Sequence, residues 1–226
     1  MNTICIESNS KCTKNSEFKK ILYLNNGFSL LIRPLEEGDA DIIQSAVMIS
    51  KDNLKPFMDW AHREIDIEQQ KERIRTSIAL FSQGTTYDFT VIDTKSNEFL
   101  MSASLRASRI PNKKSLGIGY WTSSKYCNQG LATIVTKILI VIAFESFGCD
   151  RVEIGCNKAN QKSIRVIEKC GFKLESEVRN YFSEPTSEMV QNGLNSSRTG
   201  LLFALIKDDI ENLCWYNGIA NDLIQG

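Results

Sequence analysis

The sequence has one histidine, few prolines and no long apolar run, and each absence excludes a class of protein. With His62 as the only histidine in 226 residues, a metal site with several histidine ligands cannot form within one chain, and any Ser–His–Asp or Cys–His arrangement would have to use that residue. The 4 prolines exclude a linker-rich chain. The longest apolar run, 138–144, is far shorter than the roughly 18 residues of a membrane span.

The 7 cysteines form no pattern typical of a disulfide framework or a zinc ribbon. Their number is odd and no two have the CxxC spacing, so reduced thiols in a cytoplasmic protein fit better. Residues 1–20 are polar and contain no apolar stretch typical of a secretory signal. We therefore expect a cytoplasmic protein that binds no metal and does not insert into a membrane.

Positive and negative charges balance, with 27 Lys and Arg against 27 Asp and Glu and a pI of about 6.6. This balance argues against a broad nucleic-acid-binding face, whose usual mark is a pI above about 9, so no direct nucleic-acid binding is expected. Locally the charge is uneven, because residues 99–144 contain no acid and residues 36–68 contain nine. A polyanionic ligand would suit the first segment, although a solvated hairpin explains its charge equally well. A cationic partner would suit the second, but solvated helix faces and a favourable helix start explain its charge better.

Hydrophobic periodicity predicts an α+β fold in a single domain. We expect this domain to span residues 27–208, after a polar tail at 1–26 and before a C-terminal extension at 209–226. Strands are expected at 28–33, 86–92, 98–107, 116–121, 151–156, 173–178 and 201–206. Helices are expected at 36–50, 66–82, 131–147 and 160–170.

A short loop between a predicted strand and a predicted helix is the first candidate binding segment. Its residues, Cys127-Asn-Gln-Gly-Leu-Ala132, include the small Gly130 and Ala132, which allow a ligand to approach the backbone closely. The unpaired N–H groups and the dipole of the first helical turn suit a phosphate or pyrophosphate. An ordinary tight turn into a helix has the same pattern, so this segment alone does not establish a site.

The start of the next predicted helix is the second candidate. Asn160 and Ser163 lie three residues apart there, and the helix ends near Gly171. Asn160 in this position is typical of a simple N-cap. At the mouth of a site, however, an Asn can bind an amide and a Ser can donate a proton, so both interpretations stay open.

Five motifs in this order and spacing resemble the GNAT acetyltransferase superfamily, and most closely its ribosomal-protein N-acetyltransferase branch of the RimJ/RimL type. The resemblance covers about residues 30–206. The motifs are Leu31-Ile-Arg-Pro34, Asn53-Leu-Lys-Pro-Phe-Met-Asp-Trp60, Ile118-Gly-Tyr-Trp121, Asn128-Gln-Gly-Leu-Ala-Thr133, and Asn160-Gln-Lys-Ser163 followed by Glu168-Lys-Cys-Gly-Phe172.

The resemblance implies acetyl-CoA as co-substrate, no metal, and a mixed, splayed central sheet flanked by helices. It implies that the pantetheine lies beside the strand ending at Trp121 and Thr122. It further implies that Asn160 contacts the cofactor arm, that Ser163 protonates the departing thiolate and that Trp60 lies on the acceptor side. The pyrophosphate would bind main-chain amides of a five-residue stretch: Gln129, Gly130, Leu131, Ala132 and Thr133.

The reaction implied is transfer of an acetyl group to a primary amine by direct attack in a ternary complex. A protein α-amine has a pKa near 8 and a lysine amine one near 10.4, so a site without an evident strong base suits an N-terminal α-amine. A polyamine or aminoglycoside is the alternative acceptor. A non-catalytic acyl-CoA-binding module is a further alternative, because Cys127 and Asn128 depart from the family's loop, which usually begins with Arg or Gln. We expect a monomer or homodimer.

Overall fold

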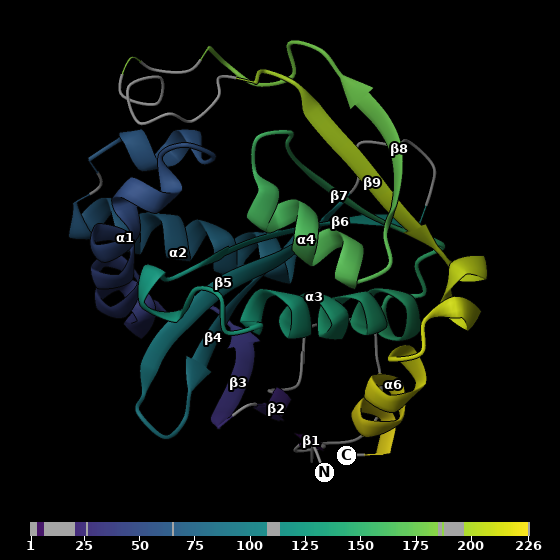
Figure 1. The fold of residues 1–226 in the computed structure, drawn as a ribbon. Coiled ribbons are helices and arrows are strands. Elements are labelled where there is room, and N and C mark those ends of the chain that lie inside the picture. Colours follow the sequence, from purple (N-terminus) through teal and green to yellow (C-terminus); the bar gives the residue numbers. More distant parts are fainter. Residues whose placement is uncertain are drawn as a thin grey trace.

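One twisted sheet runs through the computed structural model, which describes residues 4–6, 21–25, 27–64, 66–107, 114–184, 187 and 197–225 (Figure 1). Within these residues the strand order is β1-β2-β3-β4-β5-β6-β7-β9-β8. All neighbours in that order are antiparallel except β6 and β7, which are parallel. The strands are β1 (Ile4–Ile6), β2 (Ile21–Asn25), β3 (Phe28–Pro34), β4 (Thr86–Asp93), β5 (Glu98–Ala107), β6 (Ser115–Thr122), β7 (Arg151–Asn157), β8 (Lys173–Val178) and β9 (Gly200–Ile206).

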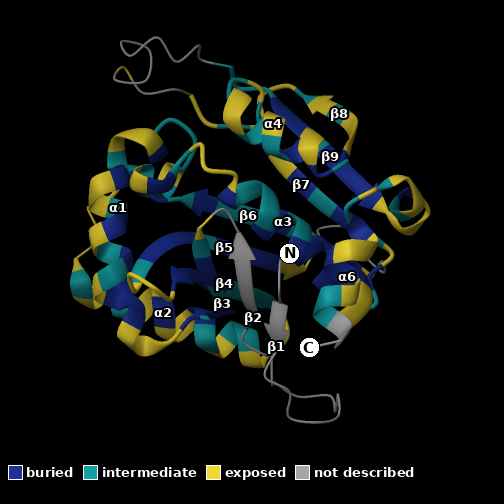
Figure 2. Ribbon diagram, turned by 60° about the horizontal axis from the view of Figure 1, so that its bottom comes forward, coloured by how far each residue is buried: buried dark blue, intermediate teal, exposed yellow. Residues whose placement is uncertain are grey.

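Helices cover both faces of the sheet, and buried residues line its two sides (Figures 1 and 2). On one face lie α1 (Ala40–Leu54) and α2 (Ile67–Ser82). On the other lies α3 (Leu131–Val141), with α4 (Gln161–Lys169) packed beside it over β7. The mixed sheet between helices confirms the α+β class predicted from the sequence.

The predicted strands and helices are all present, because each has the hydrophobic period that its environment requires. The helix expected at 36–50 lies four residues later, at Ala40–Leu54, after a 3-10 turn at Glu37–Asp39. The strands at 98–107 and 173–178 have the predicted bounds, and the other five are longer by one residue, at both ends for β6 and at one end for the rest. The apolar segment at 131–147 forms α3 and then a π-helical turn, Ile142–Ser146. This segment is buried on nearly every side, as its composition predicts.

Segments on both sides of the expected domain add to the same sheet and core. The residues expected in a polar tail contribute β1 and β2, and β2 pairs with β3. At the C-terminus α6 (Tyr216–Gln225) packs against α3 and buries Tyr216, Ile219 and Ala220. The sheet and the core thus include short apolar segments beyond residues 27 and 208, and the domain limits at these residues stay a prediction.

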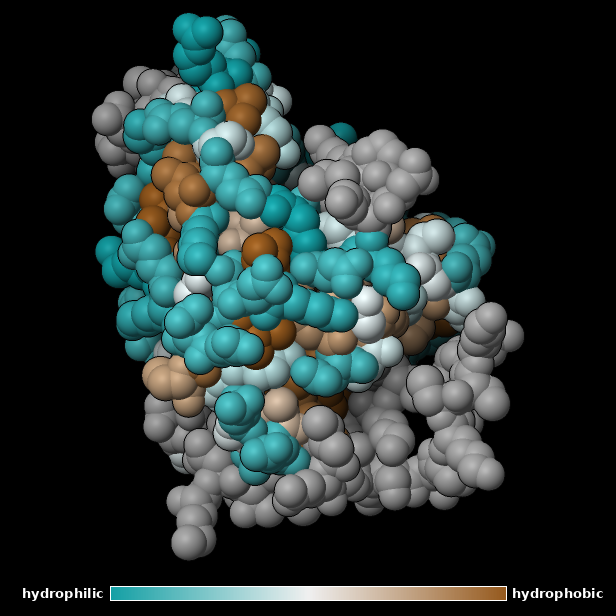
Figure 3. All heavy atoms as spheres, turned by 90° about the vertical axis from the view of Figure 1, so that its right-hand side faces the viewer, coloured by the Kyte–Doolittle hydropathy of each residue, from teal (hydrophilic) through white to brown (hydrophobic). Residues whose placement is uncertain are grey.

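The outer surface of β8, β9 and α6 is mainly hydrophilic. Figure 3 shows this side, where apolar atoms form separate patches between hydrophilic side chains. The exposed large apolar side chains of these strands are Leu174 and Ile206. This part of the sheet is therefore covered by protein on one face and by solvent over much of the other.

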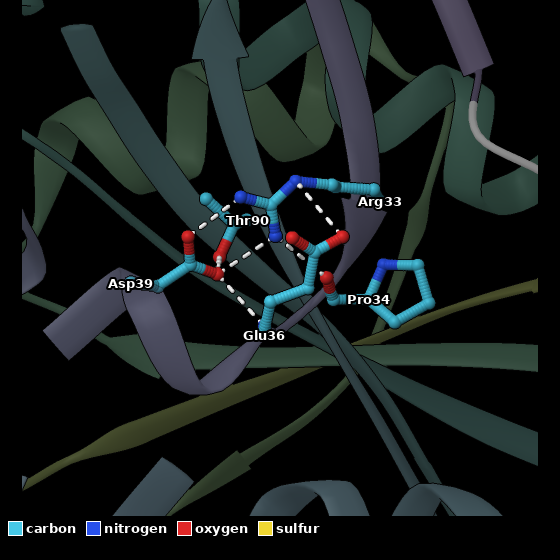
Figure 4. Close-up of polar contacts among 5 residues, drawn as sticks. All are labelled: Arg33, Pro34, Glu36, Asp39 and Thr90. Carbon is cyan, nitrogen blue, oxygen red and sulfur yellow. Dashed lines mark hydrogen bonds and ion pairs between the residues drawn. The ribbon is translucent and has the colours of Figure 1, made fainter. Parts of the chain in front are cut away.

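A buried ion pair fixes the start of α1 against the sheet (Figure 4). Arg33 on β3 binds both carboxylate oxygens of Asp39, with N···O distances of 2.6 and 2.8 Å. Thr90 on β4 donates its hydroxyl to Asp39 at 3.2 Å, and the N–H of Glu36 donates at 2.9 Å. The hydrogen bond that Arg33 donates to Asp39 raises the pKa of Arg33 above its ordinary value. These contacts connect two strands to the turn that precedes α1.

Candidate active site

The sheet opens between β6 and β7. These strands pair only from Ser115 to Ile118 on β6 and from Arg151 to Ile154 on β7. Beyond that point β6 is paired with β5 alone and β7 with β9 alone. The opening is the splay expected from the sequence resemblance, and it leaves one main-chain edge of each strand unpaired within the described part of the chain.

The direction of the main-chain groups on β6 follows from its pairing with β5. Ser123 donates its N–H to the carbonyl of Leu100 at 2.9 Å, on the β5 side. Because these groups alternate in direction along a strand, Trp121 also faces β5, and Tyr120 and Thr122 direct their N–H and C=O groups into the opening. Of the two strand residues expected beside the cofactor, the main chain of Thr122 is therefore the one that can contact a ligand there.

The side chain of Trp121 belongs to the core on the α1/α2 face. It is 9% exposed and packs against Phe99 and Trp60, with ring centroids 5.1 and 5.9 Å apart. Trp60 lies in the 3-10 turn Asp59–His62 and is half-buried. The packing of the Trp121 ring therefore does not indicate a direct contact between this ring and the cofactor. The acceptor-side role of Trp60 stays a prediction.

The first turn of α3 offers main-chain N–H groups without a capping side chain. Gly130, the N-cap residue, has a φ of 80°, and the first intrahelical bond runs from Ile134 N–H to Gly130 O at 3.1 Å. The amides of Leu131, Ala132 and Thr133 precede that bond, and no side chain caps the helix. A Cβ atom added at Gly130 would meet nothing within 4 Å, so the backbone is open to a ligand from this side.

The loop that leads into α3 is anchored on both sides. Ser124 donates its N–H to Ser50 Oγ at 2.9 Å and accepts from Asn53 Nδ2 at 2.7 Å, which connects the loop to α1. Tyr126 donates to the carboxylate of Glu98 at the start of β5. The open amides of α3 are therefore held in place before any ligand arrives.

The start of α4 is capped by its own sequence, as predicted. Asn160 Oδ1 accepts a hydrogen bond from the N–H of Ser163 at 3.1 Å. Gly171, with a φ of 89°, follows the helix and ends it. The N-cap interpretation of Asn160 is confirmed, while its contact with a cofactor arm stays a prediction.

Ser163 meets a residue that the sequence did not single out by itself. The hydroxyl of Tyr120, on β6, lies 3.0 Å from Ser163 Oγ. Burial raises the pKa of Tyr120 well above its ordinary value. The signal was present in the Gly-Tyr-Trp motif, because Tyr120 and Trp121 must point to opposite faces of the sheet. The structure therefore brings together a phenol and a serine hydroxyl beside the opening.

Acids from elsewhere in the chain offset part of the basic character expected between residues 99 and 144. Lys125 pairs with Glu98, and Arg106 lies 3.5 Å from Asp88. These acids stand outside the loop in sequence, which is why counting charges along one segment overstated its basicity. Two other basic residues of this segment, Arg109 and Lys113, lie outside the described residues.

The residues that the structure describes contain no group of three or more His, Cys, Asp or Glu side chains arranged to hold a metal ion. Over the same residues, no helix is long and apolar enough to cross a membrane.

An opened mixed sheet with an uncapped helix start beside the opening is an arrangement that suits a phosphate-bearing ligand. The acetyltransferase (GNAT) domain family matches residues 29–173, more than half of the chain. The chain therefore belongs to the GNAT acetyltransferase family, as its motifs suggested.

Individual relatives agree with this assignment. The chain is 25% identical over 154 residues to the probable N-acetyltransferase YjcK of Bacillus subtilis strain 168, covering 68% of this chain and 85% of that protein. Among solved structures, Mycobacterium smegmatis RimJ in complex with CoA-disulfide has a TM-score of 0.70 at 21% identity, covering 88% and 89% of the two chains. The RimL ribosomal L7/L12 alpha-N-protein acetyltransferase in complex with coenzyme A has a TM-score of 0.68 at 22% identity, covering 79% and 94%. At these identities the structural likeness concerns the fold.

Proposed function

We propose that this acetyltransferase moves an acetyl group from acetyl-CoA to a primary amine, in particular the α-amine of a protein N-terminus, by direct attack in a ternary complex. The observation that carries the proposal is the opening between β6 and β7, with the uncapped start of α3 beside it. Two proteins of similar fold are RimJ and the RimL ribosomal L7/L12 alpha-N-protein acetyltransferase, both solved with coenzyme A species.

The residues beside the opening fit acetyl-CoA. Its pyrophosphate would accept hydrogen bonds from the amides at the start of α3, where Gly130 leaves space and the helix dipole favours negative charge. Its pantetheine arm would lie along the unpaired edge of β6, whose polar groups at Tyr120 and Thr122 face the opening. Bound there, acetyl-CoA supplies an activated acyl group.

The chain's own groups then serve the transfer. The N–H of Thr122 or Tyr120 would donate to the carbonyl oxygen of the thioester as negative charge develops on it. Ser163 would donate its hydroxyl proton toward the departing sulfur. Holding amine and thioester in line removes much of the entropic part of the barrier.

An α-amine is the acceptor that demands least from the enzyme. His62 Nε2 lies 2.9 Å from the carbonyl oxygen of Lys55, and Glu184 is 81% exposed and paired with Arg198. These two candidates for a general base are thus engaged in other contacts. Since an α-amine has a pKa near 8, a substantial fraction is neutral at pH 7, roughly 10²-fold more than for a lysine amine.

Titration calorimetry with acetyl-CoA, and with ATP as control, is the first test. We expect acetyl-CoA alone to bind. A panel of acceptors then follows: a peptide with a free N-terminus, the same peptide blocked at the N-terminus with one lysine, and spermidine. Turnover of the free N-terminus alone supports the proposal, whereas turnover of spermidine alone would make the protein a small-amine acetyltransferase.

A non-catalytic acyl-CoA-binding module is the second candidate, and one observation favours it. Cys127, where the family usually has Arg or Gln, directs its Sγ to the carbonyl of Ser123 at 3.6 Å and adds no positive charge to the loop. Binding of acetyl-CoA without turnover of any acceptor in the panel would identify this function.

A further inference from the structure

A hydrogen bond joins the two sides of the opening. Tyr120 follows Ile118, the last residue of β6 that pairs with β7, and its hydroxyl lies 3.0 Å from Ser163 Oγ on α4. Residues 120 and 163 are 43 positions apart and belong to different parts of the fold. The contact therefore sets the position of the Ser163 hydroxyl relative to the free edge of β6.

We propose that Tyr120 is a positioning residue that holds the Ser163 hydroxyl with its proton free for the departing thiolate of CoA. This inference rests on the proposed function, because it concerns the proton that the leaving group needs. Neither the family match nor the compared proteins' names assign a role to this tyrosine.

The direction of the hydrogen bond between Tyr120 and Ser163 decides whether the serine proton is available to the leaving group. Each hydroxyl has one proton and can also accept. If the phenol donates to Ser163 Oγ, the serine proton stays free to point into the opening; the reverse direction would turn that proton away. Burial raises the pKa of Tyr120, so the phenol remains a donor throughout the pH range in which the enzyme works.

Two neighbours restrict Ser163 further. Its N–H is bound to Asn160 Oδ1, which fixes the backbone of the first helical turn. The thiol of Cys156 on β7 also interacts with Ser163, and burial raises the pKa of Cys156 to about 11. It therefore stays a thiol, which is a weak acceptor.

Every proton of the proposed acetyl transfer is accounted for. The amine nitrogen forms a bond to the acyl carbon, the carbon–sulfur bond breaks and its electron pair remains on sulfur. Sulfur takes the proton of Ser163, and the serine oxygen regains the proton that the nitrogen loses on becoming an amide. Amine and thioester thus give amide and thiol, and Tyr120 keeps its own proton throughout.

The test is Tyr120→Phe, which keeps the ring and removes the hydroxyl. We expect kcat to fall about tenfold while the KM for acetyl-CoA changes less than twofold, since the lost contact acts on the transition state. In a Ser163→Ala background the same change should have no further effect on kcat, because the group that Tyr120 positions is gone.

Tyr87→Phe is the matched control. In the unchanged protein the hydroxyl of Tyr87 donates to Gly84 O at 3.2 Å. Tyr87 lies on the α3 face of the sheet but away from the opening. We expect this variant to keep the wild-type kcat. Thermal melting and acetyl-CoA calorimetry establish that each variant is folded. Replacement of Tyr120 by 3-fluorotyrosine keeps the hydroxyl and should keep kcat within about twofold, which would confirm the role of the hydroxyl if the phenylalanine variant were unstable.

An unchanged kcat in Tyr120→Phe would overturn the inference and leave the proposed function intact. An equal loss in the wild-type and Ser163→Ala backgrounds would also overturn it, because the effect would then not pass through Ser163. A wild-type protein that binds acetyl-CoA and acetylates no amine would overturn the proposed function and, with it, this inference.

Discussion

The two arms of the sheet on either side of the opening are held together by different interactions. The arm that contains β3 to β6 is fixed by the buried pair of Arg33 and Asp39, which are 9% and 3% exposed at their side chains. The arm of β7, β9 and β8 is connected by ion pairs that are more exposed, although Asp209 is itself buried. These are Arg151–Glu175, Lys158–Glu177 and Lys173–Asp209.

This difference bears on how the site is built. Removing one partner of a buried pair leaves an unpaired charge in the interior, whereas exposed pairs are weak because water screens them. The β3–β6 arm, which carries Thr122 and Tyr120, is therefore the more strongly stabilised of the two. The other arm carries Ser163 on α4, and the hydrogen bond between Tyr120 and Ser163 connects the two arms beside the opening.

The largest effect is expected from Arg33→Ala. It leaves the Asp39 carboxylate buried without its cation and should lower the free energy of unfolding by about 3–5 kcal/mol. Urea denaturation measures this loss. Arg75→Ala is the control, because Arg75 pairs with Glu72 on the surface at 3.4 Å and should cost less than about 1 kcal/mol. Equal losses in the two variants would contradict the contrast between buried and exposed ion pairs.

Two glycines on either side of the same helical segment give the second prediction. Gly130 and Gly148 both have positive φ and open space around an added Cβ, so Ala at either position should cost about 1–2 kcal/mol in backbone strain. Only Gly130→Ala should also weaken acetyl-CoA binding, by about tenfold or about 1.4 kcal/mol. Calorimetry on both variants tests this, and equal affinities would argue against phosphate binding at the start of α3.

The third prediction compares the N-caps of α4 and α2. Asn160→Ala removes the cap of α4 and Asp66→Ala removes the cap of α2, where Asp66 Oδ1 accepts from Gln69 N–H at 2.8 Å. Each should destabilise the protein by about 1 kcal/mol. Only Asn160→Ala should in addition raise the KM for acetyl-CoA. If both variants left KM unchanged, Asn160 would be a cap and nothing more.

The smallest effect concerns Glu175 and pH. Hydrogen bonding by Arg151 lowers the pKa of Glu175 below its usual 4.5. A lowered pKa in the folded state means that the stabilisation is present above the unfolded pKa and is lost as the pH falls through the folded value. Glu175→Gln should therefore reduce stability by less than about 1 kcal/mol at pH 7.

The same variant should show a flatter loss of stability on acidification below about pH 4.5. Melting temperatures at several pH values and at two salt concentrations check this, with Glu72→Gln as the control. A loss larger than that of Arg33→Ala would reverse the ranking of the two arms.

Much of the fold was predictable because hydrophobic periodicity reports which face of an element is buried. The strand at 98–107 and the helix at 66–82 show this directly. The strand at Ile21–Asn25 was missed, because its short apolar run stands next to a polar segment and gains its partner, β3, only in the folded sheet.

The candidate site was predictable where it depends on local sequence. The left-handed turn at Gly130 and the cap at Asn160 each involve neighbours within four residues. The contact of Tyr120 with Ser163 was not predictable, since it depends on where two separate elements meet across the opening. For the same reason the sequence could not show that Lys125 is paired with Glu98.

The position of β8 at the border of the sheet bears on association between chains. In the described part of the structure β8 pairs only with β9, so its other edge presents unpaired N–H and C=O groups. Such an edge can add a strand from a second molecule, and charged side chains along it discourage this. Lys173, Glu175 and Glu177 place charges along β8, and a register shift between Leu174 and Ser176 interrupts its pairing with β9. Both features oppose edge-to-edge pairing with a second molecule, although Leu174 is exposed.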